Sequence, residues 1–459
     1  MKTKFYTLIS FLALAALSFA PVIVKAQEQQ MQFFRPNNKL GINVFETSKK
    51  DTVKFTGLKV KVGGGFTMNF QSLRASNTAT PVLKTVGTTV YNTNALTPLI
   101  DGFNLPMANM SFDVQLADGV RLNLTSYLAT RHHEETWVKG GYIQIDKVEF
   151  LHSEFLNRIM KSVTVTIGES DIDYGDQHYR RSDGGNTIYN PFVENYIMDE
   201  FSTEIGMHIY YKCAKTGLFA MGAITNGELN PTTIESTKVD AETGNINKYP
   251  PAFLGKLGYD KQLNTDFRLR VTGSFYTVNS ANSSTLFGGD RSGSNYYNVF
   301  STPYGAATTT TTQAIDYNAF SGRFNPGFSQ ENHSYMGNLF LKYKGLEFFG
   351  TAETAKGRTI TEVSNRSAKQ FAGDLIYRFP ENKENFWVGY RYNTVSATIV
   401  GNTTDVTINR NVASAGWFLT RNIMMKGEYV DQRYKDFDAT SLYNGGVFKG
   451  FMFSAVVGF

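Results

Sequence analysis

Cysteine is nearly absent from this sequence of 459 residues, which contains only Cys213. A single cysteine cannot form a disulfide within the chain, so an exported protein with this sequence needs another source of stability. Long apolar runs are equally scarce. After residues 5–20, no run of ~18 apolar residues follows, and this excludes further membrane-spanning helices. A closed β-barrel would provide stability without disulfides, because closure leaves no strand edge unpaired.

A strong charge of one sign is also lacking. The 45 Lys and Arg nearly balance the 40 Asp and Glu, for a formal net charge of +5. Three of these positive charges, Lys2, Lys4 and Lys25, lie in the N-terminal segment described next, and without them the charge is +2. Such a balance gives no support for a nucleic-acid partner or for a strongly anionic one.

The N-terminus has the features of a secretory signal peptide. Lys2 and Lys4 precede an apolar run, and Val24-Lys25-Ala26 forms a small-residue cleavage site. An uncleaved signal anchor is the alternative, but Pro21 interrupts the run soon after it reaches the minimum length for a span. We therefore predict a signal peptide over residues 1–26 and export of the mature chain.

Short segments of alternating polarity recur along the mature chain, and aromatic residues reach 14%. Alternation with many aromatic and β-branched residues is typical of β-strands. Sixteen strands are expected, at residues 58–71, 108–116, 120–130, 137–146, 162–174, 201–212, 217–225, 251–260, 266–278, 333–343, 345–356, 366–379, 385–396, 406–419, 423–434 and 446–459.

The connections between these strands alternate in length. Those after odd-numbered strands are mostly long and polar, and those after even-numbered strands are mostly short, apart from an amphipathic helix expected over residues 147–161. Short periplasmic turns and long outer loops are typical of outer-membrane barrels. The fold class predicted is therefore all-β, a transmembrane antiparallel β-barrel over residues 58–459.

Side-chain parity supports the barrel. In residues 267–276, apolar residues and Gly occupy the odd positions, and polar residues such as Arg268 and Arg270 the even ones. A wall with lipid outside and water inside requires this alternation. A soluble antiparallel β-protein with one wet face produces the same local pattern, but it would not be expected to sort its loops by length.

One block of the sequence points to a family. It includes Ile167-Gly168-Glu169, Tyr174-Gly175-Asp176, Arg180-Arg181-Ser182-Asp183-Gly184-Gly185-Asn186, Tyr189-Asn190-Pro191-Phe192, Asn195-Tyr196-Ile197-Met198-Asp199 and Thr203-Glu204-Ile205-Gly206. The block resembles the outer-membrane porins of the Bacteroidetes, distantly similar to phosphate-selective O/P-type porins. The loop here lacks the Lys-rich cluster of the O/P type, so phosphate selectivity does not follow.

The resemblance implies a porin of the bacterial outer membrane that lets small polar or ionic solutes diffuse passively through a homotrimer. It also implies that loop 175–200 folds into the lumen and narrows it. The charged residues of this loop are the predicted constriction: Asp176, Arg180, Arg181 and Asp183. The last strand resembles the signal read by the barrel assembly machinery, with Phe451, Phe453 and Phe459 as its aromatic residues.

Parity gives a second set of pore residues. The charged side chains expected to line the lumen are Arg121, Arg268, Arg270, Arg378, Arg391, Glu204 and Glu347. Rings of charge and pore diameter set the selectivity of a wet barrel. Mixed signs predict weak selectivity, with a modest anion preference because of the arginines. Each charge could instead form a salt bridge in the wall without affecting permeation.

Two other classes of function compete with a porin. An outer-membrane hydrolase could use His178 with Asp176, but no nucleophile motif accompanies this pair. An adhesin could use the flexible loop 279–332, which is rich in Ser, Thr, Asn and Gly. Calcium could bind Asp171, Asp173 and Asp176, although the spacing is not that of an EF-hand. We expect no enzymatic activity, no cofactor and no metal.

Residues 27–57 are expected to form a polar periplasmic segment ahead of the barrel. The segment includes Asp51-Thr52-Val53, which resembles the acceptor used for O-glycosylation at Thr52 in the Bacteroidetes. About 30 residues between Gln27 and Leu58 are too few for a plug domain. This argues against an active, plugged transporter, whose lumen would need filling.

Overall fold

The computed structural model describes residues 30–86, 88–129, 136–182, 186–230, 232–302, 318–402 and 404–459. The predicted signal peptide, Asp183 and most of the threonine-rich part of loop 279–332 lie outside the described residues. The chain divides into two compact units, Met1–Met31 and Gln32–Phe459. The second unit contains all the strands.

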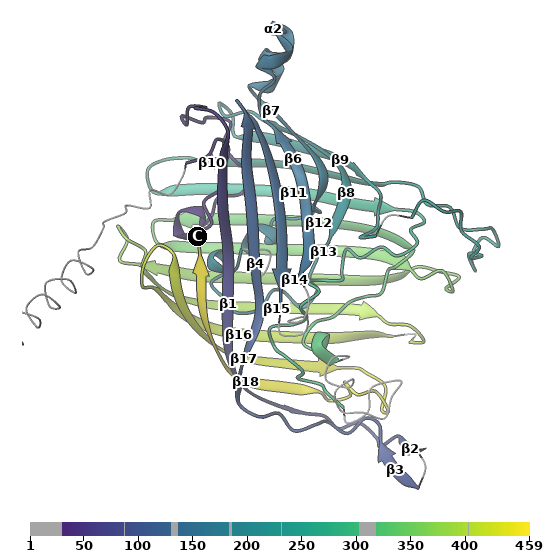
Figure 1. Cartoon of the computed structure of the whole chain (residues 1–459). Helices are drawn as coiled ribbons and strands as arrows, with labels where there is room; N and C mark the ends of the chain where they lie inside the picture. The colour runs from purple at the N-terminus through teal and green to yellow at the C-terminus, as the bar shows by residue number, and fades with distance from the viewer. Residues whose placement is uncertain are drawn as a thin grey trace, which may run out of the picture. The chain divides into compact units, whose positions relative to one another are not determined.

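Sixteen antiparallel strands close into one barrel, in the order β1-β18-β17 and so on down to β4 (Figure 1). All sixteen predicted strands are confirmed, and β2 and β3 form a small hairpin in the first long connection. The strands are β1 Lys59–Ser76, β2 Leu83–Val86, β3 Thr89–Asn92, β4 Gly102–Ala117, β5 Val120–Leu128, β6 Trp137–Ile145, β7 Val163–Asp171, β8 Thr203–Lys212, β9 Leu218–Thr225, β10 Ala252–Gln262, β11 Phe267–Val278, β12 Glu331–Tyr343, β13 Leu346–Arg358, β14 Arg366–Phe379, β15 Phe386–Thr398, β16 Asp405–Phe418, β17 Ile423–Lys435 and β18 Val447–Gly458.

The barrel closes where the first strand meets the last. Strand β1 pairs with β18 from Gly65↔Gly458 to Ser76↔Val447. Just beyond this ladder, Gly64 and Phe459 exchange two backbone hydrogen bonds of 3.0 and 3.1 Å. The terminal phenylalanine is therefore part of the seam.

The helices are short. They are η1 Lys39–Gly41, η3 Glu149–Leu151, α2 Glu154–Met160, η4 Gln177–Arg180, η5 Thr187–Tyr189 and η6 Asn318–Phe320. Elements η3 and α2 replace the single helix expected over residues 147–161, and the Ser153 side chain caps α2 by accepting from the backbone of Leu156. In the part of the chain that the structure describes, no helix is both long and apolar enough to cross a membrane.

The connections alternate in length as predicted. The tight ones, such as 118–119, 213–217 and 344–345, lie at one end of the barrel, and connection 146–162 with α2 is the exception there. The long ones, such as 172–202, 226–251 and 279–330, lie at the other end. We call these the short-turn end and the long-loop end.

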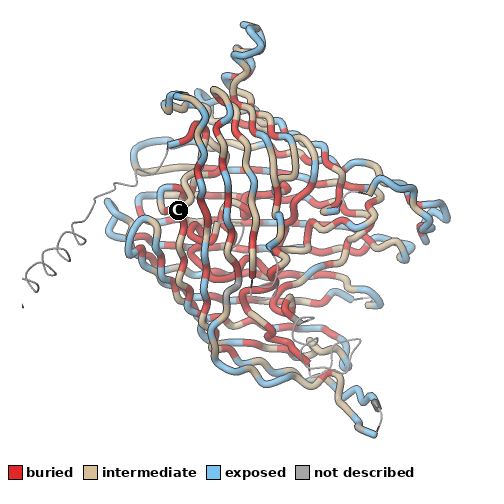
Figure 2. Tube along the Cα trace, in the orientation of Figure 1, coloured by how far each residue is buried: buried red, intermediate tan, exposed pale blue. Residues whose placement is uncertain are grey.

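Side chains alternate between the two faces of the wall. On β15, Val388 and Tyr390 are each 49% exposed, whereas Trp387 and Arg391 are 1% and 4% exposed. Many large apolar side chains are exposed in the same way on the other strands. Figure 2 shows buried and exposed positions alternating along the wall. The predicted inside and outside faces are confirmed.

The inside of the barrel is largely filled. Three segments enter it: the N-terminal strap (residues 32–53), the first inserted loop (172–202) and the second inserted loop (279–302 and 318–330). The main hydrophobic core lies within the barrel, where Phe192, Val193 and Ile197 of the first inserted loop pack with inward side chains such as Trp387 and Val412. The core joins the inserted loops to the wall.

The N-terminal strap corrects the expectation of a polar periplasmic segment. Phe33 and Phe45 are 6% and 3% exposed, and Asn38 is fully buried. Asn43 donates to Glu347 of β13 at 2.6 Å, and Glu46 is hydrogen bonded to Arg270 of β11 at 2.7 and 2.8 Å. Without being a plug domain, this segment fills part of the lumen. The expectation of an unfilled lumen is therefore wrong.

Candidate functional site

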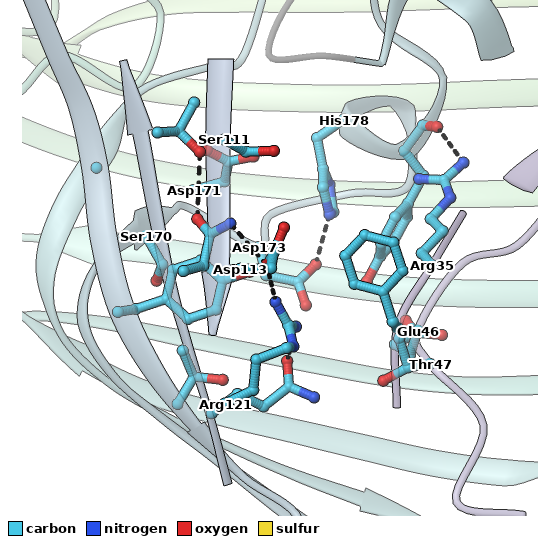
Figure 3. A pocket seen from close by; sticks show the side chains of 18 of the residues that line it. Arg35, Glu46, Thr47, Ser111, Asp113, Arg121, Ser170, Asp171, Asp173 and His178 are labelled. Carbon is cyan, nitrogen blue, oxygen red and sulfur yellow. Dashed lines mark hydrogen bonds and ion pairs between the residues drawn. The ribbon is translucent and has the colours of Figure 1, made fainter. Parts of the chain in front are cut away.

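A cavity of about 310 Å³ remains on one side of the filled barrel. Its walls are the inner faces of β4 to β8, the N-terminal strap and the first inserted loop (Figure 3). Most of its lining residues are polar or charged, and Figure 3 shows Ser111, Asp113 and Arg121 facing Arg35 and His178 across it. We call it the lateral cavity. The inserted loops leave the inner surface of β4–β8 partly uncovered.

The lateral cavity follows β7 along its whole length. Ser162 and Thr164 line it near the short-turn end, and Glu169 and Asp171 line it near the long-loop end. Nine peptide units separate Ser162 from Asp171, and at about 3.3 Å per residue they span roughly 30 Å. This distance is comparable to the thickness of the apolar core of a bilayer, about 30 Å.

Gly168 adjusts the line of side chains on β7. Its φ is +133°, and a Cβ there would lie 2.5 Å from the carbonyl oxygen of Gly141. Only glycine fits this left-handed position beside β6. Before Gly168 the even residues Thr164 and Thr166 line the cavity, and after it Glu169, Ser170 and Asp171 all line it. Glycine at this position lets β7 pass close to β6.

Basic groups gather at the short-turn half of the lateral cavity. Lys49 of the strap pairs with Asp146 at 2.9 Å, and Arg121 of β5 pairs with Asp113 of β4. Lys212 donates to the carbonyl oxygen of Glu46 at 2.8 Å. The Lys212 ammonium is held by backbone carbonyls, so its charge is not balanced by a direct ion pair among the described residues.

Carboxylates gather at the long-loop half. Asp173 pairs with Lys256 and with His178, the latter at 3.1 Å. Burial opposes ionisation, but Lys256 and His178 hold the pKa of Asp173 far below its usual range. Within the described ranges, Asp171 forms no ion pair. The two halves of the cavity therefore differ in the sign of their net charge.

The predicted pore-lining residues point inward, but most do not line this cavity. Of the seven, only Arg121 does. The others are held by partners in the wall and the inserted segments: Arg268 by Asp260, Arg270 by Asp176 and Glu46, Arg378 by Glu347, Arg391 by Asp374, and Glu204 by Thr225 and Tyr276. Their inward direction follows the prediction, and their role in permeation stays a prediction.

The predicted constriction residues hold the first inserted loop to the wall. Asp176 accepts from Arg270 at 2.7 and 2.8 Å, and Arg181 forms a bidentate pair with Asp199 at 2.5 and 2.9 Å. Arg180 borders a second, much smaller cavity. All three are buried, and Asp183 lies outside the described residues. The loop does enter the lumen, but these charges do not face the lateral cavity.

Several lining residues were not singled out from the sequence. Arg35 of the strap stacks on Tyr189, with 3.8 Å between its guanidinium carbon and the ring centroid. Lys139 and Tyr142 of β6 and Tyr210 of β8 complete the polar wall. Strand parity carried a signal for Tyr142 and Tyr210. Lys139 has the opposite parity to Tyr142 and lies at a register irregularity between β5 and β6, so parity did not indicate it. No local pattern indicated that the strap enters the lumen, so Arg35 could not be found in this way.

The alternatives based on Asp176 are corrected by the geometry. His178 pairs with Asp173, and Asp176 is committed to Arg270, Lys256 and Thr272. The proposed His178–Asp176 hydrolase pair is therefore not formed. Within the described residues, no group of three His, Cys, Asp or Glu converges as metal ligands do.

The three phenylalanines of the predicted assembly signal lie on the outer face. Phe451 and Phe453 are each 52% exposed, and Phe459 is 50% exposed. The ring of Phe451 meets Tyr429 of β17 edge to face, with ring centroids 5.1 Å apart. Recognition by assembly machinery stays a prediction.

No family model matches the chain. No curated protein matches it either. Among solved structures, it is similar to the outer membrane channel DcaP of Acinetobacter baumannii, with 10% identity, a TM-score of 0.49, and coverage of 88% of this chain and 99% of that one.

OmpT, an outer membrane protein of Vibrio cholerae, is 9% identical with a TM-score of 0.46, over 89% of this chain and 99% of that one. A BenF-like porin from Pseudomonas fluorescens Pf-5 is 10% identical with a TM-score of 0.42, over 87% and 98%. At these values, no argument about function rests on the likeness.

Proposed function

We propose that this protein is a porin of the bacterial outer membrane, and that small polar solutes diffuse through it along the lateral cavity. The single observation that carries the proposal is the cavity, lined mostly by polar residues, that follows β7 along its length in a largely filled barrel. The apolar outer face of the wall supports placement in a membrane, because lipid-facing positions of such barrels are apolar. No catalytic role is proposed.

The proposed pathway has little net charge. Five bases and five acids line it: Arg35, Lys49, Arg121, Lys139, Lys212, Glu46, Asp113, Glu169, Asp171 and Asp173. Four of the five arginines behind the expected anion preference lie away from the cavity. We therefore propose weak ion selectivity. A permeating ion passes the acidic long-loop half and the basic short-turn half one after the other, and their effects oppose each other.

Planar-bilayer recording tests the function. The wild-type protein should give persistent conductance steps, and liposomes containing it should admit small sugars. The variant Thr166→Trp places a large ring in the cavity and should lower the conductance, because pore diameter limits flow. Thr354→Trp is the matched control, since Thr354 faces outward on β13. If the folded wild type inserts into the bilayer without conducting ions, the proposal that it is a porin is rejected.

The remaining assignments are part of the proposal. The short-turn end faces the periplasm, residues 1–26 are a cleaved signal, and residues 58–459 form the barrel with the assembly signal at its end. The homotrimer, the Bacteroidetes origin and the O/P-type similarity rest on the resemblance of residues 167–206.

Modification at Thr52 is testable by the intact mass of the mature protein. Close to Thr52, Asp51 accepts from the backbone of Phe33, a contact within the strap.

A further inference from the structure

Another, much smaller cavity lies between the first inserted loop and the inner face of β13–β15. Its volume is about 20 Å³, enough for one water-sized occupant. Residues from the loop and from the wall line it, among them Arg180, Tyr196, Phe349 and Arg391. This is a different site from the lateral cavity, and the proposed pathway does not use it.

Arg180 is the unusual member of this cavity. Its side chain is 4% exposed, and none of its three nitrogens has a hydrogen-bond partner. The guanidinium lies between two rings, with its carbon 5.7 Å from the centroid of Phe340 and 4.9 Å from that of Phe349. A guanidinium carries five N–H donors, and leaving buried donors unsatisfied is costly. The buried N–H groups of Arg180 therefore need a hydrogen-bond acceptor.

The nearest carboxylate does not meet this need. The distance from Arg180 Nη2 to Glu347 Oε2 is 3.6 Å, which is too long for a hydrogen bond. Glu347 accepts from Arg378 at 2.9 Å and from Asn43 at 2.6 Å, both on Oε1, and its Oε2 has no hydrogen-bond partner. Lys342, also near Glu347, is neutralised by Glu384 at 2.8 and 2.9 Å. Arg180 therefore shares Glu347 with Arg378, as the more distant of the two ion-pair partners and without a hydrogen bond.

The other charges around the cavity also balance. Arg391 forms a bidentate pair with Asp374 at 2.7 and 2.8 Å, as Arg181 does with Asp199. Burial raises the pKa of Glu200, which lines the cavity too and shares its surroundings with Glu353. Two guanidiniums, those of Arg180 and Arg378, share the single carboxylate of Glu347. These three side chains therefore carry one net positive charge.

We propose that this cavity binds one monatomic anion of chloride size, held by the guanidinium of Arg180. The volume is too small for phosphate or for an organic acid such as gluconate, and an anion would balance the net positive charge of Arg180, Arg378 and Glu347. The hydroxyl of Tyr196, on the cavity wall, can supply a further donor. The bound anion fastens the first inserted loop to the wall.

Equilibrium dialysis with radiolabelled chloride tests the proposal. The full-length protein, folded in detergent in gluconate buffer, should bind one chloride per chain, and bromide should displace it whereas gluconate should not. Arg180→Gln should lose this binding. Arg268→Gln is the matched control: it removes another lumen-facing guanidinium, one paired with Asp260, and should keep the bound ion.

Folding of each variant is checked by heat-modifiable mobility on a gel. If Arg180→Gln does not fold, Arg180→Lys keeps the charge and should bind chloride more weakly than the wild type. The proposal is overturned if the folded wild type binds no chloride, which would mean that water fills the cavity or that Arg180 pairs with Glu347. It is also overturned if Arg180→Gln retains the wild-type stoichiometry.

Discussion

The two halves of the barrel interior differ, although the wall around them is built in the same way. The inner face of β4–β8 borders the polar lateral cavity. The inner face of β12–β18 is covered by the inserted loops, with an apolar core around Trp387 and buried ion pairs such as Arg391–Asp374. One half leaves room for solutes, and the other fixes the inserted loops.

This difference shows that an inward charge has two possible roles. In the packed half it is taken out of water and needs a partner, so its contribution is to stability. In the cavity half it can act on whatever occupies the cavity. Arg121 and Arg391 both point inward from their strands, but only Arg121 lines the lateral cavity. Which role applies depends on where the inserted loops lie.

The largest expected effect is on the stability of the packed half. Arg391→Met leaves the buried carboxylate of Asp374 without its bidentate partner and should cost about 3–5 kcal/mol of the free energy of unfolding. Denaturant titration of the folded protein in detergent measures this loss. Asp171→Asn in the cavity half should change the same quantity by less than about 0.5 kcal/mol, since Asp171 has no ion pair to lose. If both variants lost the same free energy of unfolding, the proposed difference between the packed half and the cavity half would be wrong.

Acid should weaken the attachment of the first inserted loop. Burial opposes ionisation of Asp176, but the charge and hydrogen bonds of Arg270 lower its pKa from 3.8 to about 2. The stabilisation is fully present above the unfolded value of 3.8 and is lost as the pH falls toward 2. The loss should be about 2 kcal/mol.

Denaturant titrations at pH 5 and pH 2.5 measure this acid effect. Asp176→Asn should flatten the pH dependence, because the amide does not titrate. If the wild type and the variant lose stability in parallel over this range, the ion pair does not hold the loop.

The smallest expected effect is on ion selectivity. Asp171→Asn removes a carboxylate from the long-loop half of the lateral cavity and should move the reversal potential in a salt gradient toward anions. The shift should shrink at high ionic strength, where exposed charges are screened. Asp431→Asn removes a charge paired with Arg433 instead, outside the lateral cavity, and should leave the reversal potential unchanged.

Most of the wall could be predicted from the sequence. Period-two alternation is a local signal, and it located all sixteen strands and the inward direction of residues such as Arg270 and Arg391. The resemblance of residues 167–206 also indicated that loop 175–200 enters the lumen, as one of the three segments that do. Each of these inferences uses residues close together in the chain.

The contents of the lumen could not be predicted in this way. The polar residues of the strap suggested exposure to water, yet Asn43 bonds to Glu347, 304 residues away. Asp176 and Arg180 look alike as loop charges, but Asp176 binds Arg270 and Arg180 has no hydrogen-bonded partner. Partners so distant in sequence leave no local pattern. The contacts between them fix where the inserted segments lie, and so which side of the barrel keeps a cavity.

The most direct test asks where a solute meets the protein. Cys213 is first replaced by serine, and cysteine is then placed at Thr125 in the cavity half or at Asn393 in the packed half. A water-soluble, bulky thiol reagent is added during single-channel recording. The proposed pathway predicts that the current falls with Thr125→Cys and is unchanged with Asn393→Cys. A fall with Asn393→Cys and none with Thr125→Cys would contradict it.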